Sequence, residues 1–276
     1  MRNLHGKVIL ISGASAGIGL ATALACAKAG MNASMCGRDL PRLEAAAQTI
    51  RAACPGANLH LFAADVSRQA EVEAWVADAA GCFGRVDAIY CNAGYGQLRT
   101  ILETTDREIR EMFETNYFGT LSLIQAAMPH LRKADGGLRH ILICASAAAK
   151  VGLPSYGHYS ATKAAQDAVA SALRAEMAHE GFAVSCVYPT GTRTEFFKRS
   201  GSHGHSNTPA WMEQSADQVA NAILAALHRP RPEVWPHFLT RVGVVLGTAL
   251  PSFAAAQMIK LFGRQRAQRS LQGRPE

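Results

Sequence analysis

The chain has 276 residues, 49% of them hydrophobic and 18% charged, which is typical of one large globular domain. A chain of this length buries a substantial core without disulfides or metals to hold it together. Its net charge of +7 is concentrated near the C-terminus: from Arg229 onward there are eight basic and two acidic residues, against 20 and 19 in the preceding part. Because the bulk of the chain has no positive surplus to meet phosphates, we exclude nucleic acid as a partner.

Seven cysteines are scattered through apolar stretches, without a C-x-x-C pair or a cluster with histidine. This pattern indicates free thiols in a reducing compartment and no metal site. Residues 1–6 are polar, and an apolar run follows directly, so we expect no signal peptide. The sequence therefore predicts a cytoplasmic protein.

Short apolar segments alternate with longer segments of helical periodicity. The predicted strands are 7–12, 32–36, 59–65, 86–91, 140–146 and 183–188, and the predicted helices are 17–29, 40–53, 68–82, 106–133, 155–180 and 215–228. Most of these strands are apolar throughout, which is typical of strands covered on both faces. The alternation predicts an α/β fold with a parallel, doubly wound sheet and right-handed crossovers. The polar segment 198–210 is predicted to be a mobile loop at the carboxyl edge of the sheet, where such folds bind ligands.

A glycine-rich turn follows the first predicted strand. Gly13, Gly17 and Gly19 have the spacing G-x-x-x-G-x-G, with Ser15 and Ile18 between them. Glycine at a strand-to-helix turn lets the backbone approach a pyrophosphate closely, and the start of the next helix attracts that anion. At this place in an α/β pattern, the turn indicates a dinucleotide site more strongly than a purely structural turn.

The end of the second predicted strand bears on the choice of dinucleotide. An NAD site there usually presents a carboxylate to the ribose 2′-hydroxyl, whereas an NADP site has a small residue and an arginine for the 2′-phosphate. The sequence has Gly37 and then Arg38, which favours NADP(H). Asp39 argues for NAD(H), unless it is the N-cap of the helix that starts near Pro41. We therefore expect NADP(H) in preference to NAD(H).

The ends of the third and fourth predicted strands are also candidates for cofactor contact. Asp65, followed by Val66, either hydrogen-bonds an adenine amino group or caps the next helix. Asn92, Ala93 and Gly94 end the fourth strand with small residues, which let the backbone approach the cofactor closely.

Two tyrosines precede a lysine in the segment 156–163. Tyr159 lies four residues before Lys163 and shares a helix face with it, whereas Tyr156 has Ser160 in that position. An ammonium ~4–5 Å from the phenol, at an effective dielectric of ~20, would stabilise the phenolate by roughly 3–4 kcal/mol, or about two to three pKa units. That would bring the phenol toward neutral pH, where general acid–base catalysis is most effective. We predict that Tyr159 is the catalytic tyrosine.

Two further polar residues stand out by their positions. Asn116 falls within a predicted helix although asparagine is a poor helix former, and Ser146 ends the fifth predicted strand. With these residues the chain resembles the short-chain dehydrogenase/reductase family in its single-domain form. The matching elements, in chain order, are residues 12–19, 91–94, Asn116, Ser146, 159–163 and 189–194.

The resemblance implies a Rossmann-type fold and hydride transfer between a nicotinamide and a carbonyl or alcohol carbon. It implies that Tyr159 exchanges a proton with the substrate oxygen, while Lys163 lowers its pKa and binds the nicotinamide ribose. Ser146 would hold the substrate oxygen, and Asn116 would position a water that connects Lys163 to solvent. The loop after the sixth strand would cover the nicotinamide carboxamide, and its candidate contacts are Pro189, Thr192 and Thr194.

The chain departs from the family pattern at two places. Cys91 stands where the family usually has asparagine. Thr190 and Thr192 replace the glycine and valine of the usual P-G-x-V-x-T loop, which leaves the path of that loop open. The long helical segments 106–133 and 155–180 resemble those that pair in family dimers and tetramers, so we expect a homodimer or homotetramer.

Residues 238–276 are predicted to form a helical extension of the domain 1–237. No residue from Val242 to Ile259 is charged, and the basic residues Lys260, Arg264, Arg266 and Arg269 follow. The extension is interpreted as a helix pair at the substrate mouth or on a partner subunit, or as apolar helices lying in a membrane interface with these cations toward anionic headgroups. A membrane span is disfavoured because Pro251 would break it. The first two interpretations predict a bulky hydrophobic alcohol or ketone as substrate: a lipid, steroid or retinoid-like molecule.

The leading hypothesis is thus an NADP(H)-dependent oxidoreductase. An idle NADPH-binding regulator is disfavoured because it would not need Asn116, Ser146, Tyr159 and Lys163 together. A third hypothesis is a membrane-peripheral scaffold that acts through its basic tail. Epimerisation of sugar nucleotides is disfavoured because little chain remains for a substrate domain.

Overall fold

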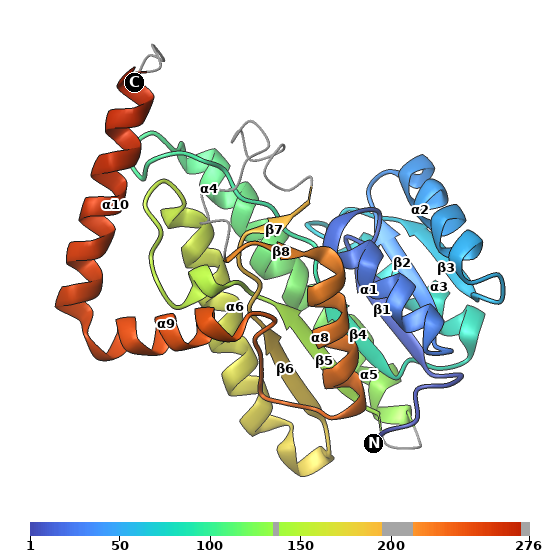
Figure 1. Ribbon diagram of the computed structural model, residues 1–276. Coiled ribbons are helices and arrows are strands. Elements are labelled where there is room, and N and C mark those ends of the chain that lie inside the picture. The colour runs from blue at the N-terminus through green and yellow to red at the C-terminus, as the bar shows by residue number, and fades with distance from the viewer. Residues whose placement is uncertain (135–137, 195–211, 272–276) are drawn as a thin grey trace.

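The computed structural model describes residues 1–134, 138–194 and 212–271, with the side chains of residues 261 and 264–271 outside the description. Within these ranges, seven strands form one parallel sheet in the order β3-β2-β1-β4-β5-β6-β9 (Figure 1). The strands are Val8–Ser12 (β1), Asn32–Gly37 (β2), Leu59–Ala63 (β3), Ala88–Cys91 (β4), His140–Cys144 (β5), Ala183–Val187 (β6) and Glu233–Val234 (β9). The predicted α/β class, with a doubly wound parallel sheet of Rossmann type, is confirmed.

Helices follow the strands as the sequence predicted, with one interruption. The helices are Gly17–Lys28 (α1), Leu40–Ala53 (α2), Gln69–Phe83 (α3), Asp106–Phe113 (α4), Gly119–Lys133 (α5), Gly157–Glu176 (α6), Ala216–His228 (α8), Phe238–Ala249 (α9) and Pro251–Leu271 (α10). The predicted helical segment 106–133 has the expected extent, but it contains a π-helical turn, Glu114–Phe118, between α4 and α5, which the sequence did not predict. Two short strands, Thr192–Arg193 (β7) and Gln214–Ser215 (β8), pair after β6, and the predicted loop 198–210 lies outside the described residues.

Most strand residues are apolar because helices cover both faces of the sheet. Along β1, Val8 and Leu10 belong to one buried cluster, while Ile9 and Ile11 belong to the other. The first cluster contains side chains of α3 and α5, and the second contains side chains of α1, α2 and α8. Successive side chains point to opposite faces of a strand. A strand that is covered on both faces therefore buries its side chains at successive positions, which favours apolar residues.

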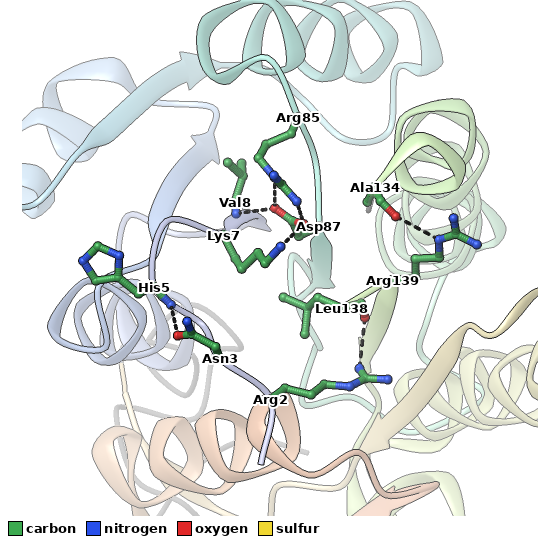
Figure 2. A network of polar contacts seen from close by, with 10 residues as sticks. All are labelled: Arg2, Asn3, His5, Lys7, Val8, Arg85, Asp87, Ala134, Leu138 and Arg139. Atoms are coloured by element: carbon green, nitrogen blue, oxygen red, sulfur yellow. Dashed lines mark hydrogen bonds and ion pairs between the residues drawn. The ribbon is translucent and has the colours of Figure 1, made fainter. Parts of the chain in front are cut away.

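A buried carboxylate holds the amino ends of β1 and β4 together, at the edge of the sheet opposite the carboxyl ends of the strands. The Asp87 side chain, fully buried, accepts a hydrogen bond from the Val8 N–H at 2.8 Å. The Arg85 guanidinium donates to both of its oxygens, at 2.6 and 2.7 Å, and the Lys7 ammonium lies 3.7 Å away (Figure 2). A buried charge is tolerated when it is paired and hydrogen-bonded in this way.

The two C-terminal helices project from the body and are joined to it at the start of α9 (Figure 1). The side chain of His237 caps α9, and Thr240, one turn in, is buried. Arg241 lies 3.9 Å from Glu233 at the start of β9, and Glu233 in turn lies 3.9 Å from Lys150. The axes of α9 and α10 are bent by 114° at the break between them.

One buried histidine predicts how stability depends on pH. His140, at the start of β5, is fully buried, and its Nε2 shares a 2.8 Å hydrogen bond with the Ser185 hydroxyl. Burial, helped by the positive charge of Arg2, lowers the pKa of His140 from 6.5 to about 3. The unfolded chain therefore takes up a proton below pH 6.5 that the folded protein refuses until about pH 3.

We expect this difference to cost on the order of 3 kcal/mol of unfolding free energy between pH 6.5 and pH 4. Urea unfolding at several pH values would measure it, and His140→Gln should flatten the curve over this window. An equally steep acid loss in the variant would contradict the assignment.

Candidate active site

A cavity of about 1450 Å³ lies at the carboxyl ends of the strands. Its walls are the glycine turn after β1, the ends of β2 to β5, the loop after β6, and one side of α9 and α10. All but two of the predicted site residues line it: Gly13, Ser15, Gly17, Ile18, Arg38, Asp65, Val66, Asn92, Ala93, Gly94, Ser146, Tyr159, Lys163, Pro189, Thr192 and Thr194. The two others, Gly19 and Asn116, pack behind the wall, as described below.

The glycine turn is built so tightly that side chains would not fit. Gly13 and Gly17 have positive φ, 66° and 56°, a conformation that favours glycine. A Cβ on Gly19 would lie 2.3 Å from the carbonyl oxygen of Gly13, so α1 can pack against the turn only with glycine there. A Cβ on Gly17 would lie 3.1 Å from the Thr194 methyl group, which brings the loop after β6 to the same turn.

Asn92 braces this turn from the neighbouring strand. Its amide donates to the carbonyl oxygens of Ser12 and Gly13, at 2.9 and 3.2 Å. The Ser12 hydroxyl oxygen accepts hydrogen bonds from the N–H groups of Asn92 and Ala93. The Asn92 side chain thus shapes the wall of the cavity, and both of its amide contacts point to the protein backbone.

Two carboxylates, Asp39 after β2 and Asp65 after β3, are used for the protein's own turns. Asp39 accepts a hydrogen bond from the Arg42 N–H at 3.0 Å and is the N-cap of α2, so this interpretation of Asp39 is confirmed. Asp65 accepts from the N–H and hydroxyl of Ser67, whereas the N-cap of α3 is Arg68, so the alternative that Asp65 caps that helix is wrong.

Arg38 remains the prominent cation at this end of the cavity. Its side chain is 73% exposed, and one guanidinium nitrogen lies 3.8 Å from the Asp65 carboxylate. Because the pair is mostly solvated, it is weak, and an anion in the cavity could compete for the guanidinium.

Lys163 is held deep in the wall by two acceptors. Its residue is 3% exposed, and the ammonium donates to the Cys144 carbonyl at 2.7 Å and to the Gln166 side-chain oxygen at 2.8 Å. Burial lowers the pKa of Lys163, since it penalises the charged form, while the thiols of Cys144 and Cys186 act in the opposite direction. An ammonium has three donors, so one is left after these two contacts.

The π-helical turn explains why asparagine stands at position 116. The Asn116 side chain accepts from the Tyr95 N–H at 2.9 Å and donates to the Tyr95 carbonyl at 2.8 Å and to the Thr162 hydroxyl at 3.0 Å. Its own carbonyl accepts from the Gln166 amide at 2.7 Å. Gln166 therefore connects the backbone of Asn116 to the Lys163 ammonium by two hydrogen bonds.

Tyr159 and Ser146 come together from different elements. Tyr159 lies in the first turn of α6, and Ser146 follows β5 directly. The two side chains share a hydrogen bond, which lowers the pKa of the phenol. The ring of Tyr156 meets that of Tyr159 edge to face, with centroids 6.1 Å apart, so both tyrosines line the cavity.

The predicted direction of the Tyr159 pKa shift is wrong for the protein alone. Burial raises the pKa of Tyr159 above its ordinary value, Cys144 adds to the rise, and the hydrogen bond with Ser146 offsets only part of it. The Lys163 ammonium lies 5.7 Å from the centre of the phenol ring and points its donors at Cys144 and Gln166. Loss of water around the phenolate thus outweighs the attraction that the i, i+4 spacing suggested.

Several contributors to the site escaped the sequence analysis. Gln166 and Thr162 were not singled out, although the spacing of Gln166 from Lys163, three residues on the same helix, could have indicated it. The sequence predicted apolar surface near the cleft, but it did not identify the residues that form this wall. They are Leu239, Val244, Leu246, Leu250, Phe253, Met258 and Phe262. Across the described ranges, no group of three or more His, Cys, Asp or Glu residues could hold a metal ion.

Comparison with known proteins connects this arrangement to a family. A family model described as short chain dehydrogenase matches residues 7–204. L-fucose dehydrogenase of Oryctolagus cuniculus is 32% identical over 213 residues, which cover 76% of this chain and 66% of that protein. Dehydrogenase/reductase SDR family member 7B of Bos taurus is 29% identical over 260 residues, 91% of this chain and 76% of that protein.

Solved structures also resemble this fold. An alcohol dehydrogenase from Thermococcus sibiricus, complexed with 5-hydroxy-NADP, has a TM-score of 0.74 and 27% identity, covering 83% of this chain and 95% of its own. The 3-ketoacyl-(acyl-carrier-protein) reductase from Brucella melitensis, complexed with NADH, has a TM-score of 0.75 and 28% identity, covering 84% and 97%. These neighbours carry different nucleotides and so do not decide between NADP and NAD. The matched residues, together with this fold, show that the chain belongs to the short-chain dehydrogenase family.

Proposed function

We propose that the protein is an NADP(H)-dependent oxidoreductase that transfers a hydride between the nicotinamide and a carbonyl or secondary alcohol of a bulky hydrophobic molecule. One observation carries the proposal: a single cavity brings together the glycine turn, the pair Ser146 and Tyr159 with Lys163 behind them, and an apolar wall from the C-terminal helices. Each part supplies a different requirement of the reaction.

The residues at the glycine turn fit a dinucleotide. No Cβ protrudes at Gly13, Gly17 or Gly19, and the N-cap of α1, Ala16, has no side chain that can hydrogen-bond. The N–H groups of the first turn of α1 are therefore available to a pyrophosphate. When bound, the nicotinamide would supply or accept the hydride.

The choice of NADP(H) rests on the end of β2. Gly37 leaves room, Arg38 supplies an exposed guanidinium, and the carboxylate of Asp39 is turned to the backbone of α2. A ribose 2′-phosphate would find a cation there and no competing acceptor at position 39.

Tyr159 would act as the acid in carbonyl reduction. Its raised pKa keeps the phenol protonated at neutral pH, so it can donate a proton to the substrate oxygen while Ser146 holds the same oxygen. The remaining donor of Lys163 would bind the nicotinamide ribose or a water positioned near Asn116.

The apolar wall supports a hydrophobic substrate. Leu239, Leu246, Leu250 and Phe253 line the cavity from α9 and α10. Apolar atoms at a binding surface gain by contact with apolar ligand surface, and they provide no partner for a hydroxyl-rich ligand. This favours a lipid, steroid or retinoid-like alcohol or ketone.

We further propose a cytoplasmic homodimer or homotetramer. Five of the seven cysteines are buried, where thiols need no disulfide partner. The helix α6 exposes a row of small residues, Ala161, Ala164 and Ala168, and Phe118 is exposed near the start of α5. Such a face would let a second copy approach closely.

Replacement of Tyr159 tests the reaction. Tyr159→Phe removes the proton donor, so we expect kcat for NADPH-dependent reduction of hydrophobic ketones to fall by about 10²–10⁴-fold. NADPH binding should stay within about twofold. Tyr156→Phe, which alters the ring beside it, should retain most activity. Full activity of Tyr159→Phe would refute the proposal, and tight NADPH binding with no turnover by the wild type would favour the idle regulator instead.

The pH dependence tests the role of the phenol. Alcohol oxidation needs phenolate, and burial raises the pKa of Tyr159, so the oxidation rate should climb as pH rises from neutral into the alkaline range. Carbonyl reduction needs the protonated phenol and should be constant through neutral pH. Initial rates in both directions across pH 6 to 10 would measure this, on the order of tenfold per unit for oxidation at the start of the range. An oxidation rate that falls with pH would be incompatible with Tyr159 as the base.

Replacement of Arg38 tests the cofactor preference. Loss of charge-assisted hydrogen bonds to a phosphate, about 1.5–3 kcal/mol, predicts that Arg38→Ser raises the Kd for NADPH roughly 10–100-fold and leaves that for NADH nearly unchanged. The exposed Arg51, in the last turn of α2, gives the control variant Arg51→Ser. Equal weakening of both cofactors, or of neither, would speak against NADP(H).

A further inference from the structure

The helix α9 carries two apolar stripes on different faces. Leu239, Leu246 and Leu250 line the cavity. Phe238, Val242 and Val245, at i, i+4 and i+7, share another face that does not line the cavity, and they are 69%, 38% and 56% exposed. A helix that covers a cavity with one face normally exposes polar residues on its other face. An exposed apolar stripe there indicates a surface that binds a partner.

The described part of α10 also exposes apolar residues that do not line the cavity. Phe253 and Met258 line the cavity, whereas Ile259 does not and is 73% exposed. Exposed alanines stand at 255 and 256 on the same part of the helix. The described part of the extension is thus apolar on both sides, and Arg241 is the one charged residue before Lys260.

The charge of the extension identifies the kind of partner. Residues 238–276 contain six basic residues and one acidic residue, Glu276. The cations Arg264, Arg266, Arg269 and Arg274 follow the apolar run in sequence, although their side chains lie outside the described residues. A second copy seated on this surface would bring more positive charge and no compensating negative charge, which is unfavourable. An anionic surface with an apolar layer beneath it satisfies both features.

The lengths of α9 and α10 bear on whether these helices would cross a bilayer or lie along its surface. Within the described chain, no single helix has the length and apolar composition needed to cross a bilayer; α9 and the first half of α10 reach them only as a pair, bent by 114°. Helices of this kind lie in the plane of the interface, with their apolar faces at the boundary between headgroups and acyl chains.

We propose that α9 and α10 dock on an anionic lipid bilayer, with Phe238, Val242, Val245 and Ile259 entering the acyl boundary. The net positive charge of residues 238–276 would attract such a surface, and anionic lipids are concentrated in the cytoplasmic leaflet of membranes. The inner stripe then remains on the cavity, so that the same helix is apolar toward the cavity and toward the bilayer. The proposed membrane docking does not rest on the proposed reaction.

Sedimentation of the full chain with vesicles tests the docking. Vesicles of phosphatidylcholine with phosphatidylserine should bind the protein, and binding should weaken with salt and be at least about tenfold weaker on pure phosphatidylcholine. The triple variant Phe238→Ser, Val242→Ser and Val245→Ser should lose at least about tenfold in binding to the mixed vesicles. Leu102→Ser, which alters a 96% exposed leucine before α4, is the matched control and should bind like the wild type.

Folding and cofactor binding are measured in the same samples. Because the three replaced side chains are exposed and outside the cavity, Tm and the Kd for NADPH should remain unchanged. The proposal is overturned if the wild type ignores mixed vesicles, if the triple variant binds them as well as the wild type, or if the stripe instead mediates a dimer that the triple variant abolishes. None of these results depends on turnover, so failure of the docking and failure of the proposed reaction are distinguishable.

Discussion

A buried ammonium is the constraint around which the site is arranged. Removing a lysine charge from water costs several kcal/mol unless its donors find acceptors. Lys163 meets that cost with the Cys144 carbonyl and the Gln166 amide oxygen, which fix it at the end of β5. Cys144 is the last residue of β5, so this contact places the ammonium at the carboxyl edge of the sheet. The position of the cation is thus dictated by the sheet itself.

The irregular helix before α5 serves the same arrangement. A regular helix at Glu114–Phe118 would direct the Asn116 side chain and carbonyl differently, and π turns are frequent where function requires such a shift. Here the side chain ties down Tyr95, and the carbonyl accepts from Gln166, which holds Lys163. Even Gly94 takes part, since a Cβ there would lie 3.0 Å from the Asn116 side-chain oxygen and 3.3 Å from the Lys163 ammonium.

Features that depend on neighbouring residues could be predicted from the sequence, whereas features that depend on distant residues could not. Periodicity is local, so the six long strands and the helices between them were predicted, and so was the gathering of the strand ends in one cavity. β9 was missed because its two residues lie between prolines and form no apolar run. The sequence signalled the π turn only as an asparagine within a predicted helix, because the turn's hydrogen-bond partner, Gln166, lies 50 residues away.

The electrostatic prediction failed for a different reason. Spacing on a helix gives the separation of two side chains, but it contains no measure of how much water surrounds them. In the folded protein the desolvation of Tyr159 outweighs the nearby cation. The second apolar stripe of α9 was likewise visible in the sequence only as an uncharged run, and the fold was needed to separate residues that line the cavity from those that do not.

The central claim is that Tyr159 is a neutral phenol, half-buried beside a fixed cation, in the protein without cofactor. Its ionisation is measured most directly by ultraviolet difference absorbance between the wild type and a Tyr159→Phe variant during a pH titration. The account predicts that the absorbance difference appears only above the ordinary tyrosine pKa of about 10. It predicts that the difference moves to lower pH when the positively charged nicotinamide ring of an oxidised cofactor lies beside the phenol. A phenolate signal at neutral pH in the cofactor-free protein would contradict it.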